Sequence, residues 1–309
     1  MNYNMMRDGE AVTAEQATVR PFIKWAGGKT QLLPELMSRV PAQFGRYHEP
    51  FIGSAALFFR LHSLGKLRHQ SILSDANQAL IELYRVVRDD VEELLAALQV
   101  HAGHATDRDY YYAVRDWDRQ PDWARRTPVE RAARMLFLNK TCFNGLHRVN
   151  QRGYFNVPFG RYDNPKLGSP ANLRAASRAL QGVELLVDDF SGVLRRAESG
   201  DLIYFDPPYL PVSATAAFTA YTRDPFGVHE HRRLAQIFTA LAERGCTVLL
   251  SNSHTPLTYE LYNRFTIAEI SARRAINSVA AKRGAVREVL VQSIAATPLE
   301  QVLKHSSKP

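Results

Sequence analysis

After Pro21 the sequence alternates between short apolar runs that end in turn residues and longer stretches with helical spacing. This alternation is typical of an α/β protein, in which helices cover a sheet. The runs predicted to form strands are residues 46–51, 71–74, 183–187, 202–205, 247–251 and 288–293. Residues 77–98 carry apolar side chains at every third or fourth position, which predicts one long helix, and a second helix is predicted over 229–244.

The segment 107–170 breaks this alternation, because it is rich in aromatic and arginine side chains and is punctuated by glycine and asparagine. Such a composition fits poorly with another strand and helix unit, so we interpret it as an inserted, mostly helical second domain. The sheet domain then comprises residues 19–106 and 171–298. Residues 1–18 are expected to form a flexible extension and residues 299–309 a tail.

The net charge of +8 favours polyanionic partners, because a basic surface attracts them at long range and releases their counterions. Residues 115–174 hold twelve basic side chains against five acidic ones, so this segment accounts for most of the excess. Two interpretations of its first part, residues 115–134, stay open: direct contact with nucleic acid, or a solvated helix face.

The composition argues against several other classes of protein. No stretch reaches the roughly 20 consecutive apolar residues that cross a bilayer, and the first twenty residues lack the compact apolar block of a secretory signal. Cys142 and Cys246 are far apart in the sequence, which gives neither a zinc-binding spacing nor a disulfide framework. We therefore expect no metal, no membrane and a reducing, cytoplasmic environment.

The most informative motif is Asp206-Pro207-Pro208-Tyr209, which follows the apolar run 202–205. We expect it at the carboxyl end of a strand, where open α/β sheets bind ligands. Its prolines lack amide donors and fix the backbone, so the loop presents the Asp206 carboxylate and the Pro207 carbonyl as acceptors. Two such acceptors would grip the amine of an adenine, and Tyr209 would stack on a base removed from the duplex. The alternative is a loop that merely ends a strand, with Tyr209 in the core.

A second motif, KWAGGKT at residues 24–30, imitates the end of a phosphate-binding P-loop. The P-loop requires a further glycine five positions before Gly28, where this chain has Ile23, so nucleotide hydrolysis is disfavoured. The small residues between Trp25 and Lys29 would instead admit a small cofactor, with Lys29 serving its carboxylate. A tight turn with a core tryptophan is the alternative.

Two further segments follow predicted strands. Residues 49–55 lead through Gly53 into a helix, and glycine permits the close approach of a ligand there. Asp75 comes about twenty residues later, at the distance where an acidic side chain hydrogen-bonds ribose hydroxyls in nucleoside-binding sheets. Asp75 could instead cap the next helix, although Asn77 can fill that role.

Taken in order, these segments resemble the Dam-type adenine-N6 DNA methyltransferases, which are class I enzymes with a DPPY loop. The similarity is carried by residues 24–29, 50–53, 74–77, 138–150, 153–160, 206–209, 213–215, 218–221 and 250–252. It spans nearly everything from Phe22 to Val291. One departure is Ala55, which stands where the family commonly has glycine.

The resemblance implies a class I methyltransferase fold, a mixed sheet whose inserted domain, 107–170, recognises the DNA target. It also implies S-adenosylmethionine as the methyl donor, without a metal. The residues implied for cofactor binding are Trp25, Lys29, Phe51, Gly53, Asp75, Phe190 and Asp206. The residues implied for catalysis are Asp206, Pro207, Pro208 and Tyr209.

The residues that the resemblance implies for DNA binding are Lys140, Phe143, Asn144, Leu146, Arg148, Asn150, Pro158 and Arg161. Arg148 is expected to make a bidentate contact to guanine in the major groove, whereas Lys140 and Arg161 are expected on phosphates. Phe143 would help to fill the space left by the displaced base, with an ordinary core aromatic as the alternative. The basic run 273–287 is interpreted as a loop over DNA or as a solvated loop.

These features predict transfer of a methyl group to adenine N6 in duplex DNA by base flipping and direct in-line attack. GATC is the target expected from the family, and a bacterial or phage-encoded monomer is expected, in DNA replication or in restriction-modification. The alternatives are methylation of an RNA base or a protein amide, nucleotide hydrolysis, and a non-catalytic DNA-binding protein descended from an enzyme.

Overall fold

The computed structural model describes residues 19–25, 27, 29, 31–209, 226–273 and 285–293. Several sequence predictions fall on residues outside these ranges. They concern the extension 1–18, the tail 299–309, residues 213–221, most of the basic run 273–287, and Ala26, Gly28 and Thr30.

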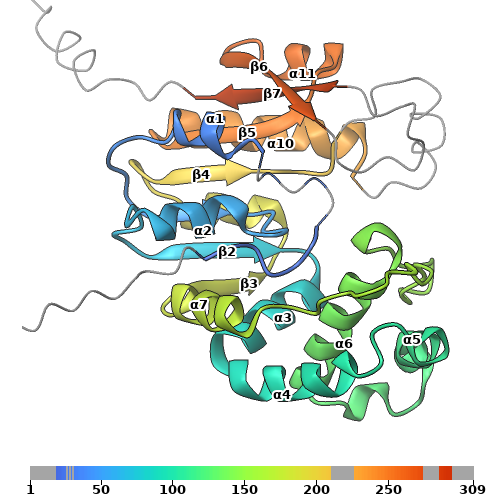
Figure 1. Ribbon diagram of the computed structural model, residues 1–309. Coiled ribbons are helices and arrows are strands. Elements are labelled where there is room, and N and C mark those ends of the chain that lie inside the picture. Colours follow the sequence, from blue (N-terminus) through green and yellow to red (C-terminus); the bar gives the residue numbers. More distant parts are fainter. Residues whose placement is uncertain are drawn as a thin grey trace, which may run out of the picture.

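A mixed sheet forms the centre of the described structure, with the strand order β3-β2-β1-β4-β5-β7-β6 (Figure 1). The strands are β1 (Tyr47–Glu49), β2 (Ser71–Asp75), β3 (Glu184–Val187), β4 (Leu202–Phe205), β5 (Thr247–Ser253), β6 (Thr266–Arg273) and β7 (Ala285–Gln292). Strands β1 to β5 are parallel, whereas β7 is antiparallel to β5 and β6. The expected fold class, an α/β methyltransferase-type mixed sheet, is confirmed.

Helices cover this sheet and also form a separate group beside α3, at the β3 side of the sheet (Figure 1). The described helices are α1 (Leu33–Met37), α2 (Ala56–Ser63), α3 (Gln78–Asp89), α4 (Val91–Ala102), α5 (Arg108–Arg115), α6 (Pro128–Thr141), α7 (Pro170–Leu180), α8 (Val193–Arg196), α10 (Val228–Glu243) and α11 (Pro256–Leu261). Helix α3 packs on β2 and β3, α10 packs on β5, and α4 and α5 pack on α6.

Two predictions of secondary structure are wrong. The single helix over 77–98 is two helices, because Asp90 leaves the helical region with φ −129° and ψ 41° and separates α3 from α4. Aspartate competes with helical hydrogen bonding and favours helix ends. Strand β6 was not predicted, because Thr266–Arg273 lies at the edge of the sheet and lacks a continuous apolar run.

One hydrophobic cluster joins the sheet to the inserted segment, since Leu57 and Leu83 share it with Tyr111, Leu136 and Phe137. A second cluster lies around β4, β5 and α10 and includes Phe205, Phe238 and Leu250. The inserted segment therefore packs on the sheet domain through a shared core. The division into domains at 107 and 170 stays a prediction.

Candidate functional site

The carboxyl ends of β1, β2 and β4 lie at one edge of the sheet, and each leads into a predicted site segment. Strand β1 lies between β2 and β4, and the three strands are parallel. Gly53 follows β1, Asp75 ends β2, and Asp206 follows β4 directly. The topology thus brings together three segments that are far apart in the sequence.

Asp206 is paired with the buried ammonium group of Lys29, whose Nζ lies 2.8 Å from Oδ1. The Lys29 side chain is 5% exposed and the Asp206 side chain 20% exposed, while the Oδ1 atom that faces Lys29 is itself buried. Burial raises the pKa of Asp206 to about 6, while Lys29 lowers it and Glu288 raises it further. Lys29 also donates to the Gly27 carbonyl within its own motif, and its ion pair with Asp206 connects that motif to the loop after β4.

Tyr209 is fixed from two sides. The Lys29 ammonium lies 4.4 Å from the centre of its ring, a cation–π contact. Its hydroxyl donates a 2.9 Å hydrogen bond to Oε2 of Glu288, a buried carboxylate of β7. The alternative that Tyr209 is an ordinary core residue is not what the structure shows, since the half-buried ring is held by two charged groups.

A further carboxyl group lies behind Asp206. Glu49 is buried at the end of β1 and accepts a 2.8 Å hydrogen bond from the Tyr47 hydroxyl. Burial raises its pKa to about 8, and the nearby Asp206 charge adds to the effect. Glu49 is therefore mainly protonated at neutral pH and adds no full negative charge beside Asp206.

The residues predicted for cofactor binding after β1 and β2 lie against one another. Gly53 has φ +45°, and a Cβ there would lie 3.0 Å from Cδ1 of Trp25, so a side chain at position 53 would push the indole away. Asp75 Oδ1 accepts a 2.9 Å hydrogen bond from the Asn77 amide, and burial raises the pKa of Asp75 to about 6. Asn77, as predicted, caps α3.

Ala55 adopts φ 52° and ψ 35°, the left-handed region. A residue with a Cβ is strained there, by roughly 1–2 kcal/mol. A glycine at this position would avoid that strain.

Phe51 and Phe190 do come together, but as a stacked pair rather than as an open platform. Their ring centres are 5.4 Å apart with an interplanar angle of 22°. Phe190 is only 5% exposed, and the guanidinium of Arg233 lies 4.5 Å from its ring centre. An adenine that packs on Phe190 would need one of these neighbours to move.

The predicted DNA-binding residues lie at the end of α6 and in the loop that follows it. Lys140 is half-buried near Lys24, and burial lowers its pKa to about 8. Phe143 is 42% exposed, which argues against the core alternative, and the next residue, Asn144, has φ 57°. The remaining exposed members are Arg148, Asn150, Pro158 and Arg161, with Leu146 half-buried.

Arg148 is oriented by a neighbour on the same loop. Its Nε donates to Asn156 Oδ1 at 2.7 Å, and its Nη2 donates to the Asn156 carbonyl at 3.2 Å. Asn156 therefore fixes the guanidinium plane of an exposed arginine.

Asn139, near the end of α6, connects this loop to the amino-terminal motif. It accepts from the Lys24 amide at 2.9 Å and donates to the carbonyls of Lys24 at 2.7 Å and Gly145 at 3.2 Å. His147 adds a stacked contact with Trp25, with ring centres 5.1 Å apart. We call the segment between α6 and α7, residues 142–169, the recognition loop. Asn139 and His147 thus connect this loop directly to the motif at residues 24–30, which is predicted to bind the cofactor.

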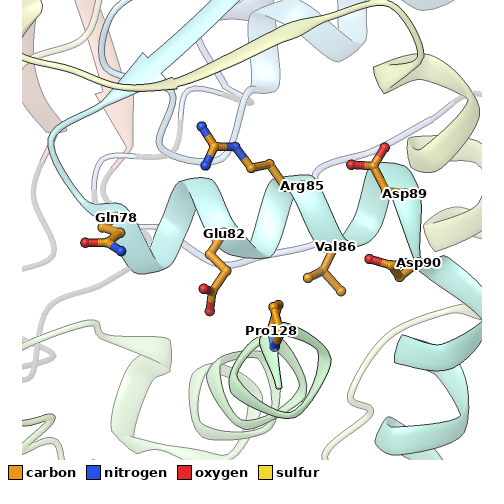
Figure 2. Close-up of a pocket in the computed structure, with 7 residues that line it drawn as sticks. All are labelled: Gln78, Glu82, Arg85, Val86, Asp89, Asp90 and Pro128. Atoms are coloured by element: carbon orange, nitrogen blue, oxygen red, sulfur yellow. The ribbon is translucent and has the colours of Figure 1, made fainter. Parts of the chain in front are cut away.

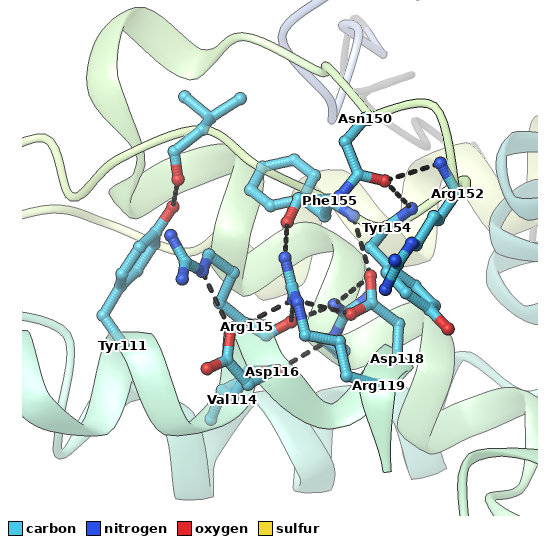
Figure 3. Close-up of polar contacts among 12 residues, drawn as sticks. Tyr111, Val114, Arg115, Asp116, Asp118, Arg119, Asn150, Arg152, Tyr154 and Phe155 are labelled. Carbon is cyan, nitrogen blue, oxygen red and sulfur yellow. Dashed lines mark hydrogen bonds and ion pairs between the residues drawn. The ribbon is translucent and has the colours of Figure 1, made fainter.

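Most arginines of residues 115–134 form ion pairs within the protein. Neither direct contact with nucleic acid nor a solvated helix face therefore accounts for all of them. Asp118 pairs with Arg134 at 2.9 Å and with Arg119 at 2.8 Å, and it accepts from the Phe155 amide at 2.8 Å (Figure 3). Arg131 pairs with Glu82 of α3 at 2.6 Å. These contacts fasten the recognition loop and α6 to the rest of the chain.

A pocket between α3 and α6 lies apart from all of the predicted site residues. It is lined by Gln78, Glu82, Arg85, Val86, Asp89, Asp90 and Pro128, with Glu82 and Val86 facing Pro128 (Figure 2). Among the described residues, no group of three or more metal-ligating side chains is found, and no helix is long and apolar enough to cross a membrane.

The fold and this edge together define a class I methyltransferase, in which an Asp-Pro-Pro-Tyr loop adjoins the segments after β1 and β2. The chain belongs to the D12 class N6 adenine-specific DNA methyltransferase family, which it matches over residues 25–276. The predicted class of enzyme is therefore confirmed.

Similar proteins include bacterial and archaeal enzymes. The chain is 39% identical to the type II methyltransferase M1.LlaDCHI of Lactococcus lactis subsp. cremoris, over 88% of this chain and 95% of that protein. It is 38% identical to the type II methyltransferase M.MjaIII of Methanocaldococcus jannaschii, over 89% and 99%. It is 36% identical to the DNA adenine methylase of Escherichia coli K12, over 88% and 94%.

Sequence reasoning assigned no role to Glu288, Asn139, Asn156 or His147. Asn139, Asn156 and His147 lie inside the stretches that resemble the family, so the motif itself was the available signal. Glu288 offered only a weaker one, an acidic residue at the start of an otherwise apolar predicted strand.

Proposed function

We propose that the protein methylates N6 of adenine within GATC in duplex DNA, after the target base has rotated out of the helix. The observation that carries the proposal is the partly exposed Asp206 carboxylate, paired with Lys29 beside Tyr209. Membership of an adenine-specific family gives the substrate class. The GATC target, base flipping and the roles of individual residues are the proposed part.

The chain's own groups would hold the amine for transfer. The Asp206 carboxylate and the Pro207 carbonyl would accept its two hydrogens and turn its lone pair out of the ring plane. Tyr209 would stack on the extruded base, and Lys29 would favour the ionised form of Asp206. S-adenosylmethionine supplies an already activated methyl group, so positioning is the main task of the protein.

The segments after β1 and β2 fit this methyl donor. The missing Cβ of Gly53 keeps the Trp25 indole close to the backbone, and the half-buried Asp75 presents a carboxylate to ribose hydroxyls. Lys29, Phe51, Phe190 and Asp206 would complete the pocket. Separation of the Phe51 and Phe190 rings would then accompany binding of the adenine moiety.

For sequence recognition we assign the main contact to Arg148. Asn156 occupies the Nε and Nη2 edge of its guanidinium, which leaves the Nη1 and Nη2 edge for a bidentate contact to guanine. Leu146 and Pro158 would meet a thymine methyl group. Phe143 and Asn144 would fill the gap left by the base.

The wider setting is also proposed. Residues 107–170 would form the target-recognition domain, with Lys140, Asn150 and Arg161 on the DNA backbone. We expect a bacterial or phage-encoded monomer that works in the cytoplasm. The two cysteines, both free and buried, are compatible with such a reducing environment. Similarity to a type II methyltransferase supports a role in restriction-modification, and a role in DNA replication is the other expectation.

The catalytic assignment is tested with Asp206→Ala. Removal of the acceptor should lower methyl transfer to a GATC duplex by roughly 10²-fold or more, measured with labelled methyl donor. Asp163→Ala removes an exposed carboxylate of the recognition loop and should leave transfer near that of the parent protein. Circular dichroism would establish that both variants are folded. Near-normal transfer by the Asp206 variant would refute the mechanism.

The target is tested with duplexes in which each base of GATC is replaced in turn. We expect replacement of the target adenine to abolish transfer, because the acceptor amine is then missing. Among the other replacements, loss of the guanine that Arg148 would read should lower transfer most. Structured RNA and protein substrates, assayed beside them, should accept no label. Equal transfer to all duplexes would reject GATC, and preferential labelling of RNA or protein would reject DNA as the substrate.

A further inference from the structure

Glu288 is a buried carboxylate in an apolar part of the sheet. It lies on β7, opposite Ser253 of β5 and Ile270 of β6, and is 8% exposed. The three residues that follow it, Val289, Leu290 and Val291, are at most 1% exposed. A buried carboxylate lowers the stability of the protein unless it is hydrogen-bonded or ion-paired. Its presence here therefore needs a physical explanation.

Glu288 is bonded to the Asp-Pro-Pro-Tyr loop that follows β4. The Tyr209 hydroxyl donates to Glu288 Oε2 at 2.9 Å, across 79 residues of sequence. A hydrogen bond to an ionised acceptor is stronger than one between neutral groups. The bond holds the outer end of the Tyr209 ring, while Lys29 lies over the ring itself.

We propose that Glu288 is a positioning residue for methyl transfer, which fixes the Tyr209 ring in the plane on which the target adenine stacks. Glu288 would not touch the base and would act only through the Tyr209 hydroxyl. The inference rests on the proposed stacking role of Tyr209. Because small displacements of a substrate reduce the rate strongly, a ring that is free to tilt would lower turnover more than binding.

The charges around the site favour this role over a purely structural one. Glu288 disfavours ionisation of Asp206, whereas Lys29 favours it. A neutral acceptor at position 288 would avoid that conflict and would still fill the space. The carboxylate therefore adds an electrostatic cost beside the catalytic loop, and the stronger bond to Tyr209 is the contact that offsets it.

A double-mutant cycle tests the proposal on the intact protein. Glu288→Ala and Tyr209→Phe should each lower kcat for a GATC duplex by about tenfold, with KM values for DNA and methyl donor changed much less. The double variant should be no slower than Tyr209→Phe alone within about twofold, because both changes remove the same bond. Glu288→Gln retains an acceptor oxygen and should recover part of kcat.

A control on the same strand separates positioning from general damage to β7. Gln292 lies four residues further on the same face of the strand, so Gln292→Ala should leave kcat unchanged. Thermal unfolding should show that every variant is fully folded at the assay temperature. Effects of Glu288→Ala and Tyr209→Phe that multiply, or a normal kcat for Glu288→Ala, would overturn the proposal. A parent protein that methylates no adenine duplex would instead overturn the proposed function itself, and this inference with it.

Discussion

In the proposed mechanism the Asp206 carboxylate accepts a hydrogen bond from the adenine amine, so its ionisation, which Lys29 favours and Glu288 disfavours, should set how activity depends on pH. Its folded-state pKa is about 6, above the ordinary value, mainly because it is buried. Below that pH the carboxyl group is protonated and one acceptor for the amine is lost. We therefore expect kcat/KM to fall as the pH decreases through about 6, since this ratio reports the ionisation of the free enzyme. The measurement is a pH profile at constant ionic strength.

Variants of Lys29 and of Glu288 should shift the acidic limb of the pH profile of kcat/KM in opposite directions. Lys29 lowers the pKa of Asp206, so Lys29→Met should move the limb to higher pH, and Glu288→Gln should move it to lower pH. Glu49, with a pKa of about 8, is protonated over this range and should not distort the limb. A limb that stays in place in both variants would mean that another group limits activity.

Single residues show where prediction from sequence ends. Asp206 and Asp75 could be predicted because each directly follows an apolar strand, and such strand ends meet at one edge of a parallel sheet. Glu288 and Asn139 could not, because their partners are 79 and 115 residues away in the sequence. No local spacing encodes such pairs. They follow from the order of the strands and from the packing of α6.

Strands were predictable where their sequence carries a dense run of apolar residues, and edge strand β3 was predicted from its run 183–187. Strand β4 matched its predicted bounds because all four of its residues are buried, which produces a continuous apolar run. Strand β6 lies at the sheet edge and was missed. The break at Asp90 was missed because apolar spacing continues from α3 into α4, with Val91 and Leu94 in register with the helix before them.

At the scale of elements, Asp118 is predicted to hold the recognition loop on α6. Asp118→Ala would leave Arg134, only 7% exposed, without its ionic partner, and would remove the acceptor for the Phe155 amide. We expect a loss of about 3 kcal/mol in the free energy of unfolding. Urea unfolding, with midpoint and slope compared with the parent protein, provides the measurement.

Asp116→Ala is the matched control for this network. Asp116 also pairs with Arg119, but its side chain is 40% exposed, and exposed ion pairs contribute at most about 1 kcal/mol. The Asp118 variant should also bind GATC duplexes more weakly than the Asp116 variant. Equal unfolding free energies for the two variants would show that the buried network does not anchor the loop.

At the scale of the whole molecule, the net charge of +8 overstates how many basic side chains are free to bind DNA, because many arginines are ion-paired within the chain. Arg119, Arg126, Arg131 and Arg134 are all ion-paired within the chain. Arg161, by contrast, is exposed on the recognition loop, and no carboxylate among the described residues pairs with it. Affinity for DNA should therefore depend on a small set of loop cations, rather than on the arginine-rich helices as a group.

The number of loop cations that contact DNA phosphates can be measured from the salt dependence of DNA binding. Each neutralised phosphate releases counterions and adds about 0.9 to the slope of log K against log salt, so Arg161→Ala should reduce the slope by about 1 for any DNA sequence. Arg148→Ala should instead reduce discrimination against a changed guanine, by about 1–3 kcal/mol. Arg126→Ala, which removes an internally paired charge, should leave the slope unchanged. A decrease with Arg126→Ala as large as that with Arg161→Ala would mean that the internal ion pairs open to bind the DNA backbone.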